Sequence, residues 1–166
     1  MISSRFCDRF LGWLDWVQPH HTLHGSSATG RITLADPRAG FVGDPDAGLY
    51  VHPTIVDGVT MDDDLYKQET FGPIVGVASF ADFDEAIALA NGTRYGLQAG
   101  IFTADVRAAL RAAQELEFGG VTVNEAPTFR ADQMPYGGVK DSGNTREGPA
   151  YAVRELTEQR VVVIDL

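Results

Sequence analysis

The chain has 166 residues, 44% of them hydrophobic and 22% charged, so its length fits one domain that buries roughly 70% of the surface of its extended chain. Its net charge of −10 and the lack of a Lys- or Arg-rich block argue against nucleic-acid binding. Its apolar runs are too short to cross a membrane, and charged residues interrupt the first twenty positions. The composition therefore predicts a cytoplasmic protein without a membrane partner.

Residues 3–17 have the apolar spacing of a short amphipathic helix, with a stripe made of Phe6, Cys7, Phe10, Leu11, Leu14 and Val17. Cys7 is the only cysteine, so it cannot form an intramolecular disulfide. A thiolate near Arg5 and Arg9 could be a nucleophile. No catalytic motif surrounds it, however, and we favour a small side chain in the core.

Residues 18–48 lack regular periodicity and are predicted to form a long loop or arm. His20, His21 and His24 lie in it without a carboxylate beside them in sequence, and we expect no native metal site there. Three adjacent acidic residues at 62–64 also suggest a metal ligand set. Neighbouring side chains on a helix diverge, so these residues are better interpreted as a solvated first helical turn.

The segment at residues 68–73 lies between an acidic stretch and the apolar run 74–80, which we predict to be a buried strand. It places Glu69, Phe71 and a Gly-Pro turn together, an arrangement suited to holding a ligand. A further strand is predicted over 48–56, where the ordered body of the protein is expected to begin.

The remaining elements alternate between strand and helix. Strands are predicted at 95–102 and 121–124, and helices at 82–91 and 105–117, the second with a stripe of Val106, Ala109, Leu110, Ala113 and Leu116. Gly96 and Gly100 are interpreted as points of close backbone approach. With the strand at 73–80, the pattern predicts an α/β fold with a parallel β-α-β-α-β sheet and covering helices.

The segment 125–141 leaves the last of these strands at its carboxyl end, where ligands bind in such sheets. A third helix is predicted to run to Leu156, with Asn144 or Thr145 as its N-cap and Pro149 in its first turn. The β-branched run at 160–166 needs covering on both faces, and pairing with a sheet, including that of another subunit, would cover it.

Three motifs in order give a family resemblance. They are Glu69-Thr70-Phe71-Gly72-Pro73, then Leu89-Ala90-Asn91-Gly92-Thr93-Arg94-Tyr95-Gly96-Leu97, then Met134-Pro135-Tyr136-Gly137-Gly138-Val139-Lys140-Asp141-Ser142-Gly143 followed by Arg146-Glu147-Gly148. From about Gly48 to Leu166 the chain resembles the C-terminal part of the NAD(P)-dependent aldehyde dehydrogenase superfamily. Residues 124–130 most resemble members that oxidise small polar or aromatic aldehydes.

The resemblance implies roles for particular residues. Glu69 would accept hydrogen bonds from hydroxyls of the nicotinamide ribose of NAD or NADP, and Phe71 would lie against the nicotinamide end. Phe129 would line the aldehyde pocket. The final strand would join a neighbouring sheet, in a homo-oligomer or with a full-length aldehyde dehydrogenase. Asn144-Thr145 replaces the family's usual glycine, which affects only the local turn.

The resemblance also implies what the sequence lacks. The family needs a nucleophilic cysteine, a glutamate that activates water and a nucleotide-binding domain, and none appears here. Cys7 lacks the Gly-Gln that precedes the family nucleophile, so we assign no catalytic residue. The predicted organisation is a divergent arm at 1–48, a partial catalytic domain at 49–157 and an oligomerisation strand at 158–166. Three hypotheses stay open: an inactive fragment of the enzyme, a non-catalytic partner of a full-length relative, and a degraded gene product.

Overall fold

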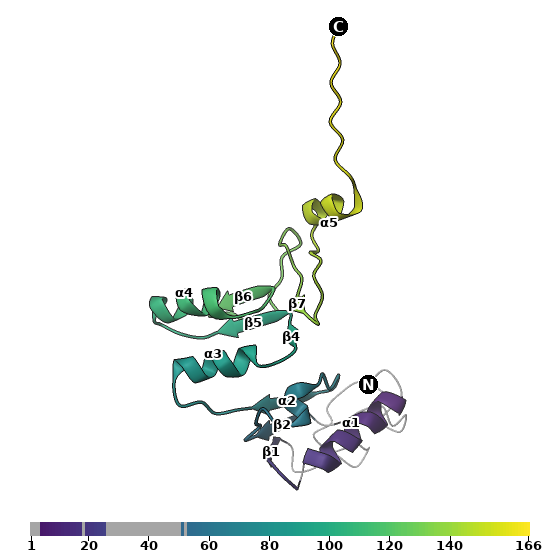
Figure 1. Cartoon of the computed structure of the whole chain (residues 1–166). Coiled ribbons are helices and arrows are strands. Elements are labelled where there is room, and N and C mark those ends of the chain that lie inside the picture. Colours follow the sequence, from purple (N-terminus) through teal and green to yellow (C-terminus); the bar gives the residue numbers. More distant parts are fainter. Residues whose placement is uncertain (1–3, 18, 26–50, 52) are drawn as a thin grey trace. The chain divides into compact units, whose positions relative to one another are not determined.

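The computed structural model describes residues 4–17, 19–25, 51 and 53–166 (Figure 1). The chain divides into two compact units, Met1–Phe80 and Ala81–Leu166. The domain boundaries predicted from the sequence, at 48/49 and 157/158, differ from this division and stay a prediction. In the described part of the chain, no helix is long and apolar enough to cross a membrane.

The first unit is built on helix α1, Ser4–Val17, and a three-stranded sheet. The strands are β1, Thr22–Gly25, β2, Thr54–Asp57, and β3, Ile74–Val77, in the order β1-β2-β3. β1 is antiparallel to β2, and β2 is parallel to β3. A one-turn helix, α2, Asp64–Lys67, precedes β3.

The predicted stripe of α1 forms much of the core of this unit. Cys7, Phe10 and Leu14 are buried against Val51, and Val17 is buried against Val56 and Val59. Ile74 packs against both groups, which joins the helix to β3. The prediction of the helix and of a core role for Cys7 is confirmed.

The other face of β2 and β3 is exposed. Ile55 lies opposite Val75, and Val77 follows two residues later on the same face, because side chains alternate along a strand. All three are exposed. The prediction that 74–80 is a buried strand is therefore wrong in this structure, where β3 is shorter and α1 and α2 cover one face only.

The segment 18–48, predicted as a loop, contains β1, while 26–48 lies outside the described residues. Leu23 of β1 packs against the core, and tertiary pairing with β2 supplies the hydrogen bonds that four residues cannot form alone. The predicted strand at 48–56 begins at Thr54 in the structure; residues 48–50 and 52 lie outside the described range.

Asp63 is not the solvated carboxylate that the sequence predicted. Its Oδ2 accepts from the Thr60 N–H at 2.6 Å and the Thr60 hydroxyl at 2.9 Å, and its Oδ1 lies 3.1 Å from His21 Nε2. The side chains of Asp63 and His21 are only 15% and 7% exposed. Folding thus places a carboxylate beside one of the histidines that had none in sequence.

We expect Asp63 to make the first unit less stable in acid. Burial acts to raise the pKa of Asp63, but the Thr60 and His21 contacts outweigh it and lower the pKa below its usual value. A carboxyl whose pKa is lower in the folded state stabilises the fold above its unfolded pKa, near 4, and loses that contribution as pH falls through the folded pKa. Denaturant unfolding between pH 7 and pH 3 should show a shallower pH dependence in Asp63→Asn than in the parent. The exposed neighbour variant Asp62→Asn is the control, and equal slopes in both variants would contradict the prediction.

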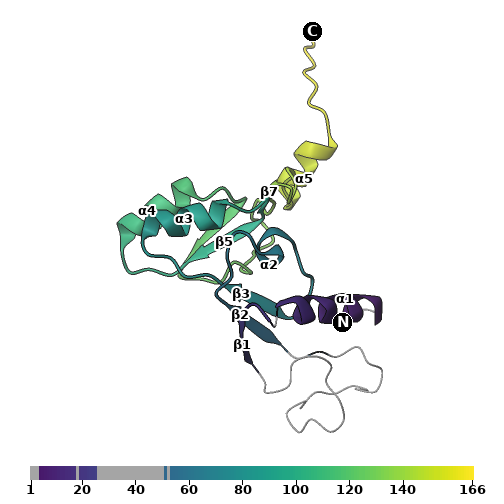
Figure 2. The ribbon, with the colours of Figure 1, turned by 60° about the horizontal axis from the view of Figure 1, so that its bottom comes forward.

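The second unit has helices and strands in close alternation. Its elements are α3, Phe83–Asn91, β4, Tyr95–Gly96, β5, Gln98–Ile101, α4, Val106–Glu115, β6, Gly120–Val123, β7, Val139–Lys140, and α5, Pro149–Leu156. The helices begin as the sequence indicates, since the Asp82 and Asp105 side chains accept from backbone N–H groups of α3 and α4. α3 and α4 lie side by side in both ribbon views (Figures 1 and 2).

The α/β class is confirmed, and the parallel crossover is seen in β5-α4-β6. The strand pairings of the structure lie within the two units. β3 pairs with β2, β5 pairs with β6, and β4 pairs antiparallel with β7. The strand predicted at 95–102 is split at Leu97, because its two halves have different partners.

The predicted apolar stripe of α4 is only partly used. Ala112, outside that stripe, is its one buried residue, while Val106 and Leu110 are exposed. Periodicity identified the helix correctly but not the face that is covered in this structure.

Asn91 ties the ends of α3 and α4 together. Its Nδ2 donates to the Glu115 carbonyl at 2.7 Å and its Oδ1 accepts from the Glu117 N–H at 2.9 Å. We expect Asn91→Ala to lower the unfolding free energy of this unit by about 2 kcal/mol, because two hydrogen bonds at about 1 kcal/mol each are lost. Denaturant titration followed by circular dichroism measures the loss. Asn144→Ala, at an exposed position, is the matched control, and equal effects in the two variants would contradict the prediction.

Helix α5 starts later than predicted. Gly148, with φ of +108°, is its N-cap, and Pro149 occupies the first turn, so the prediction of Asn144 or Thr145 as N-cap is wrong. Residues 157–166 form no helix or strand and extend away from α5 (Figures 1 and 2). Val161 and Val163 are each 88% exposed.

Candidate functional site

The predicted ligand loop, 68–73, connects the end of α2 to the amino end of β3. Gln68 caps α2 through its N–H, which donates to the Asp64 carbonyl at 2.8 Å. At the other end, the Ile74 N–H donates to the Gly72 carbonyl at 2.8 Å, where β3 begins. The loop is thus anchored at both ends within the first unit.

Two residues of helix α1 contact the same loop. A Cβ atom at Gly72 would lie 2.3 Å from Phe10 Cδ2, so only glycine fits over the buried ring. An Arg9 guanidinium nitrogen donates to the Glu69 carbonyl at 3.2 Å. The sequence suggested the Gly-Pro turn but not the two α1 residues that hold it, because they lie some sixty positions earlier.

The two predicted cofactor residues project from this support. Glu69 is exposed, and Phe71 is 65% exposed with a φ of +48°, a left-handed conformation that is uncommon for an aromatic residue. An exposed carboxylate can accept hydrogen bonds from two vicinal hydroxyls, and an exposed ring offers a flat apolar surface. The chemistry and exposure of this pair fit the nicotinamide-ribose end of NAD or NADP.

The predicted pocket residue lies in the second unit. Phe129 is 49% exposed, and its N–H closes a turn on the Ala126 carbonyl at 3.0 Å. The next residue, Arg130, pairs with Glu147 at 2.5 Å, and its guanidinium lies 4.6 Å from the centre of the Tyr136 ring. The segment 125–141 is therefore held in shape by side chains from beyond it.

Arg146 and Glu147 close this segment, a role that sequence reasoning missed. Arg146 Nη1 donates to the Gly138 carbonyl at 2.7 Å, and the Glu147 N–H donates to the Tyr136 carbonyl at 2.6 Å. A Cβ at Gly137 would lie 2.1 Å from the Thr145 carbonyl oxygen. The Gly-Gly and Arg-Glu-Gly motifs are thus spaced so that the chain between them folds back and brings them into contact.

Other motif residues act as internal clamps. Lys140 Nζ lies 2.8 Å from both the Asn91 carbonyl oxygen and Glu117 Oε2. The Ser142 hydroxyl accepts from the Gly96 N–H at 3.0 Å. The second and third motifs therefore brace each other, and no local pattern signals these contacts because their partners are 23 to 49 residues apart.

The remaining candidates are not assembled into a site. Cys7 is completely buried in the core of the first unit. Among the described residues no group of three or more His, Cys, Asp or Glu side chains could hold a metal ion. His20 contacts the Trp16 carbonyl, and nothing is described of the side chain of His24. Glu69 and Phe71 share one loop, while Phe129 belongs to the other unit.

Comparison with known proteins gives the family of this chain. Residues 24–162 match the model of the aldehyde dehydrogenase family. The 3-sulfolactaldehyde dehydrogenase of Priestia megaterium is 50% identical over 119 residues, which are 72% of this chain and 25% of that protein. The lactaldehyde dehydrogenase of Methanococcus maripaludis strain S2 is 46% identical over 114 residues, or 69% and 24%.

Solved structures give the same result. Aldehyde dehydrogenase 21 from Physcomitrella patens, in complex with the reaction product succinate, has a TM-score of 0.82 and 34% identity, over 99% of this chain and 31% of that one. Betaine aldehyde dehydrogenase from Staphylococcus aureus, in complex with NAD+, has a TM-score of 0.79 and 29% identity, over 93% and 29%. The chain spans about a quarter of the length of the curated relatives it matches. The chain belongs to the aldehyde dehydrogenase family.

Proposed function

We propose that this chain supplies the distal part of an aldehyde dehydrogenase catalytic domain, with Glu69 and Phe71 contacting the nicotinamide ribose of NAD or NADP. The observation that carries the proposal is the support of their loop. Gly72 rests on Phe10 and Arg9 holds the Glu69 carbonyl, so the carboxylate and the ring are presented to solvent on a fixed backbone. Such preorganisation is what cofactor positioning requires.

The proposed substrate is a small aldehyde with a polar substituent next to the carbonyl. The two curated relatives described above act, by their names, on lactaldehyde and 3-sulfolactaldehyde, and they share 46 to 50% identity with this chain in the matched region. Phe129 supplies an apolar wall for such a substrate, on a segment held by Arg130, Arg146 and Glu147.

By itself this sequence should oxidise no aldehyde, because its one cysteine is buried in the core and has no activating partner motif. The purified chain should show no NAD(P)-dependent oxidation of lactaldehyde above a buffer blank. Robust turnover that Cys7→Ala abolishes would overturn this part of the proposal.

A chimera tests the role of Glu69. Residues 48–166 replace the matching segment of the Priestia megaterium enzyme, and reduction of NAD and of NADP is followed with 3-sulfolactaldehyde and lactaldehyde. Glu69→Gln should lower kcat/KM for the cofactor about tenfold, because hydrogen bonds to a charged acceptor become bonds to a neutral one. Glu158→Gln, at an exposed position, is the matched control. An unchanged kcat/KM in Glu69→Gln would refute the assignment.

A second candidate function is non-catalytic pairing with a homologous chain. The extended, exposed segment that includes Val161 and Val163 favours it, since such a segment can add a strand to a sheet edge. The partner would be a second copy of this chain or a full-length aldehyde dehydrogenase. Removal of 160–166 should abolish co-purification with the partner. A replacement of Val161 and Val163 by threonine, which keeps β propensity, should weaken it less. A monomer indifferent to the deletion would count against pairing.

A further inference from the structure

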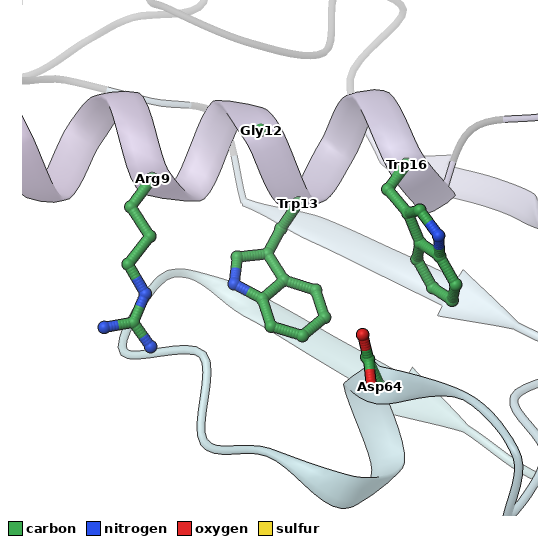
Figure 3. A pocket seen from close by; sticks show the side chains of 5 residues that line it. All are labelled: Arg9, Gly12, Trp13, Trp16 and Asp64. Carbon is green, nitrogen blue, oxygen red and sulfur yellow. The ribbon is translucent and has the colours of Figure 1, made fainter.

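A hollow in the first unit lies between α1 and the start of α2. It has a volume of about 230 Å³ and is lined by Arg9, Gly12, Trp13, Trp16 and Asp64 (Figure 3). Three of these side chains project from α1 toward α2, and the Asp64 carboxylate points back toward the indole rings (Figure 3). At about 30 Å³ for a water-sized group, the hollow accommodates a molecule of roughly seven or eight non-hydrogen atoms.

Gly12 is one of the residues that line this hollow. It lies in the middle of α1, where glycine costs about 1 kcal/mol relative to alanine. A Cβ atom at this position would meet nothing within 4 Å, so close packing does not require glycine here. The Cβ of a larger residue at position 12 would therefore lie in open space.

The lining has the chemistry of an organic cation site. Trp13 and Trp16 are arranged edge to face, with centroids 6.4 Å apart and an interplanar angle of 84°. The His20 ring packs on Trp16 with centroids 5.6 Å apart, so a cation would meet the part of Trp16 that His20 leaves uncovered. Indole faces attract ammonium groups, and a carboxylate beside them supplies the counter-charge. Within the described part of the chain, the Asp64 carboxylate accepts one long hydrogen bond, 3.4 Å from Gln68 Nε2. Its capacity to bind a further donor is therefore largely unused.

We propose that this hollow binds a small organic ammonium ion, with the cation against Trp13 and Trp16 and Asp64 as its counter-ion. Arg9 lies at the far end, about two helical turns from Trp16, and its guanidinium donates to the Glu69 carbonyl. The ligand therefore carries its positive group at the tryptophan end, away from Arg9. The net charge of −10 raises the local concentration of cations around the chain.

The two tryptophans are the only ones in the sequence, so intrinsic fluorescence reports on the hollow directly. Tetramethylammonium chloride, titrated into the full chain, should change the emission with saturation. Sodium chloride and sodium butanoate at the same ionic strength should not. Asp64→Asn should weaken tetramethylammonium binding about fivefold, as loss of one exposed counter-ion predicts. Asp62→Asn, the same charge change two residues away and outside the hollow, should leave it unchanged.

Gly12→Leu provides a second test that does not depend on charge. The leucine should fill the hollow and abolish binding, while the thermal midpoint stays equal or rises because leucine favours the helix. Non-saturating fluorescence changes in the parent chain would overturn the proposal, as would equal affinities in Asp64→Asn and Asp62→Asn. Binding of butanoate as tight as that of tetramethylammonium would do the same, and so would a folded Gly12→Leu variant that still binds.

Discussion

Gly119→Ala is expected to destabilise the second unit by about 3 kcal/mol, near the upper end of the usual cost of overpacking. A Cβ at Gly119 would lie 1.7 Å from the Gly137 carbonyl oxygen and 2.7 Å from its carbonyl carbon. Both are backbone atoms, so a rotamer change cannot relieve the clash. The Gly119 N–H also donates to the Gly96 carbonyl at 3.0 Å, which restrains the backbone further.

Hydrogen exchange measures this loss of stability in the strands next to Gly119. The N–H groups of β5 and β6 should exchange much faster in Gly119→Ala than in the parent chain, because the variant separates the 119–120 backbone from the loop at Gly137. Gly12→Ala is the matched control, since the same substitution in open space on α1 should be neutral or stabilising. Equal exchange in the parent and Gly119→Ala would show that the close approach of these two glycines does not exist in solution.

Phe10→Ala is expected to cost the first unit about 3–5 kcal/mol, the range measured for buried Phe→Ala substitutions. The Phe10 side chain is completely buried, packs with Cys7, Leu14 and Val51, and forms the surface under Gly72. Its removal leaves a cavity beneath the loop that presents Glu69 and Phe71. The variant should therefore lose both the stability of the first unit and the fixed position of Glu69 and Phe71.

Denaturant unfolding monitored by tryptophan fluorescence checks this result, because Trp13 and Trp16 both lie on the same helix as Phe10. Phe6→Ala, also on α1 but 39% exposed, is the matched control and should cost much less. In the chimera proposed above, Phe10→Ala should also raise KM for the cofactor at temperatures where the variant is still folded. A stability loss under 1 kcal/mol would mean that Phe10 does not carry the core of this unit.

Local patterns predicted α1, α3 and α4 well because each is specified by residues close in sequence. The stripe from Phe6 to Val17 defined α1, and the helices predicted at 82–91 and 105–117 are seen as α3 and α4. Gly96 was correctly interpreted as a close approach, since a Cβ there would lie 2.6 Å from the Glu117 carbonyl oxygen. Pairing partners were predicted less well. β1 was missed, and the pairing of β3 with β2 was not predicted, because pairing depends on contacts distant in sequence.

By itself, the sequence determined the family, the α/β class, the amphipathic helices and the identity of the candidate residues Glu69, Phe71 and Phe129. Periodicity, caps and motif spacing are all encoded within a few neighbouring positions. Only the tertiary structure decided how these residues are held. Phe10 and Arg9 support the Glu69 loop, and Asn91 and Lys140 brace the second unit through bonds to backbone atoms 24 and 49 positions away. The physical reason is that these contacts form only when the chain folds back on itself. Patterns among neighbouring residues therefore do not predict them.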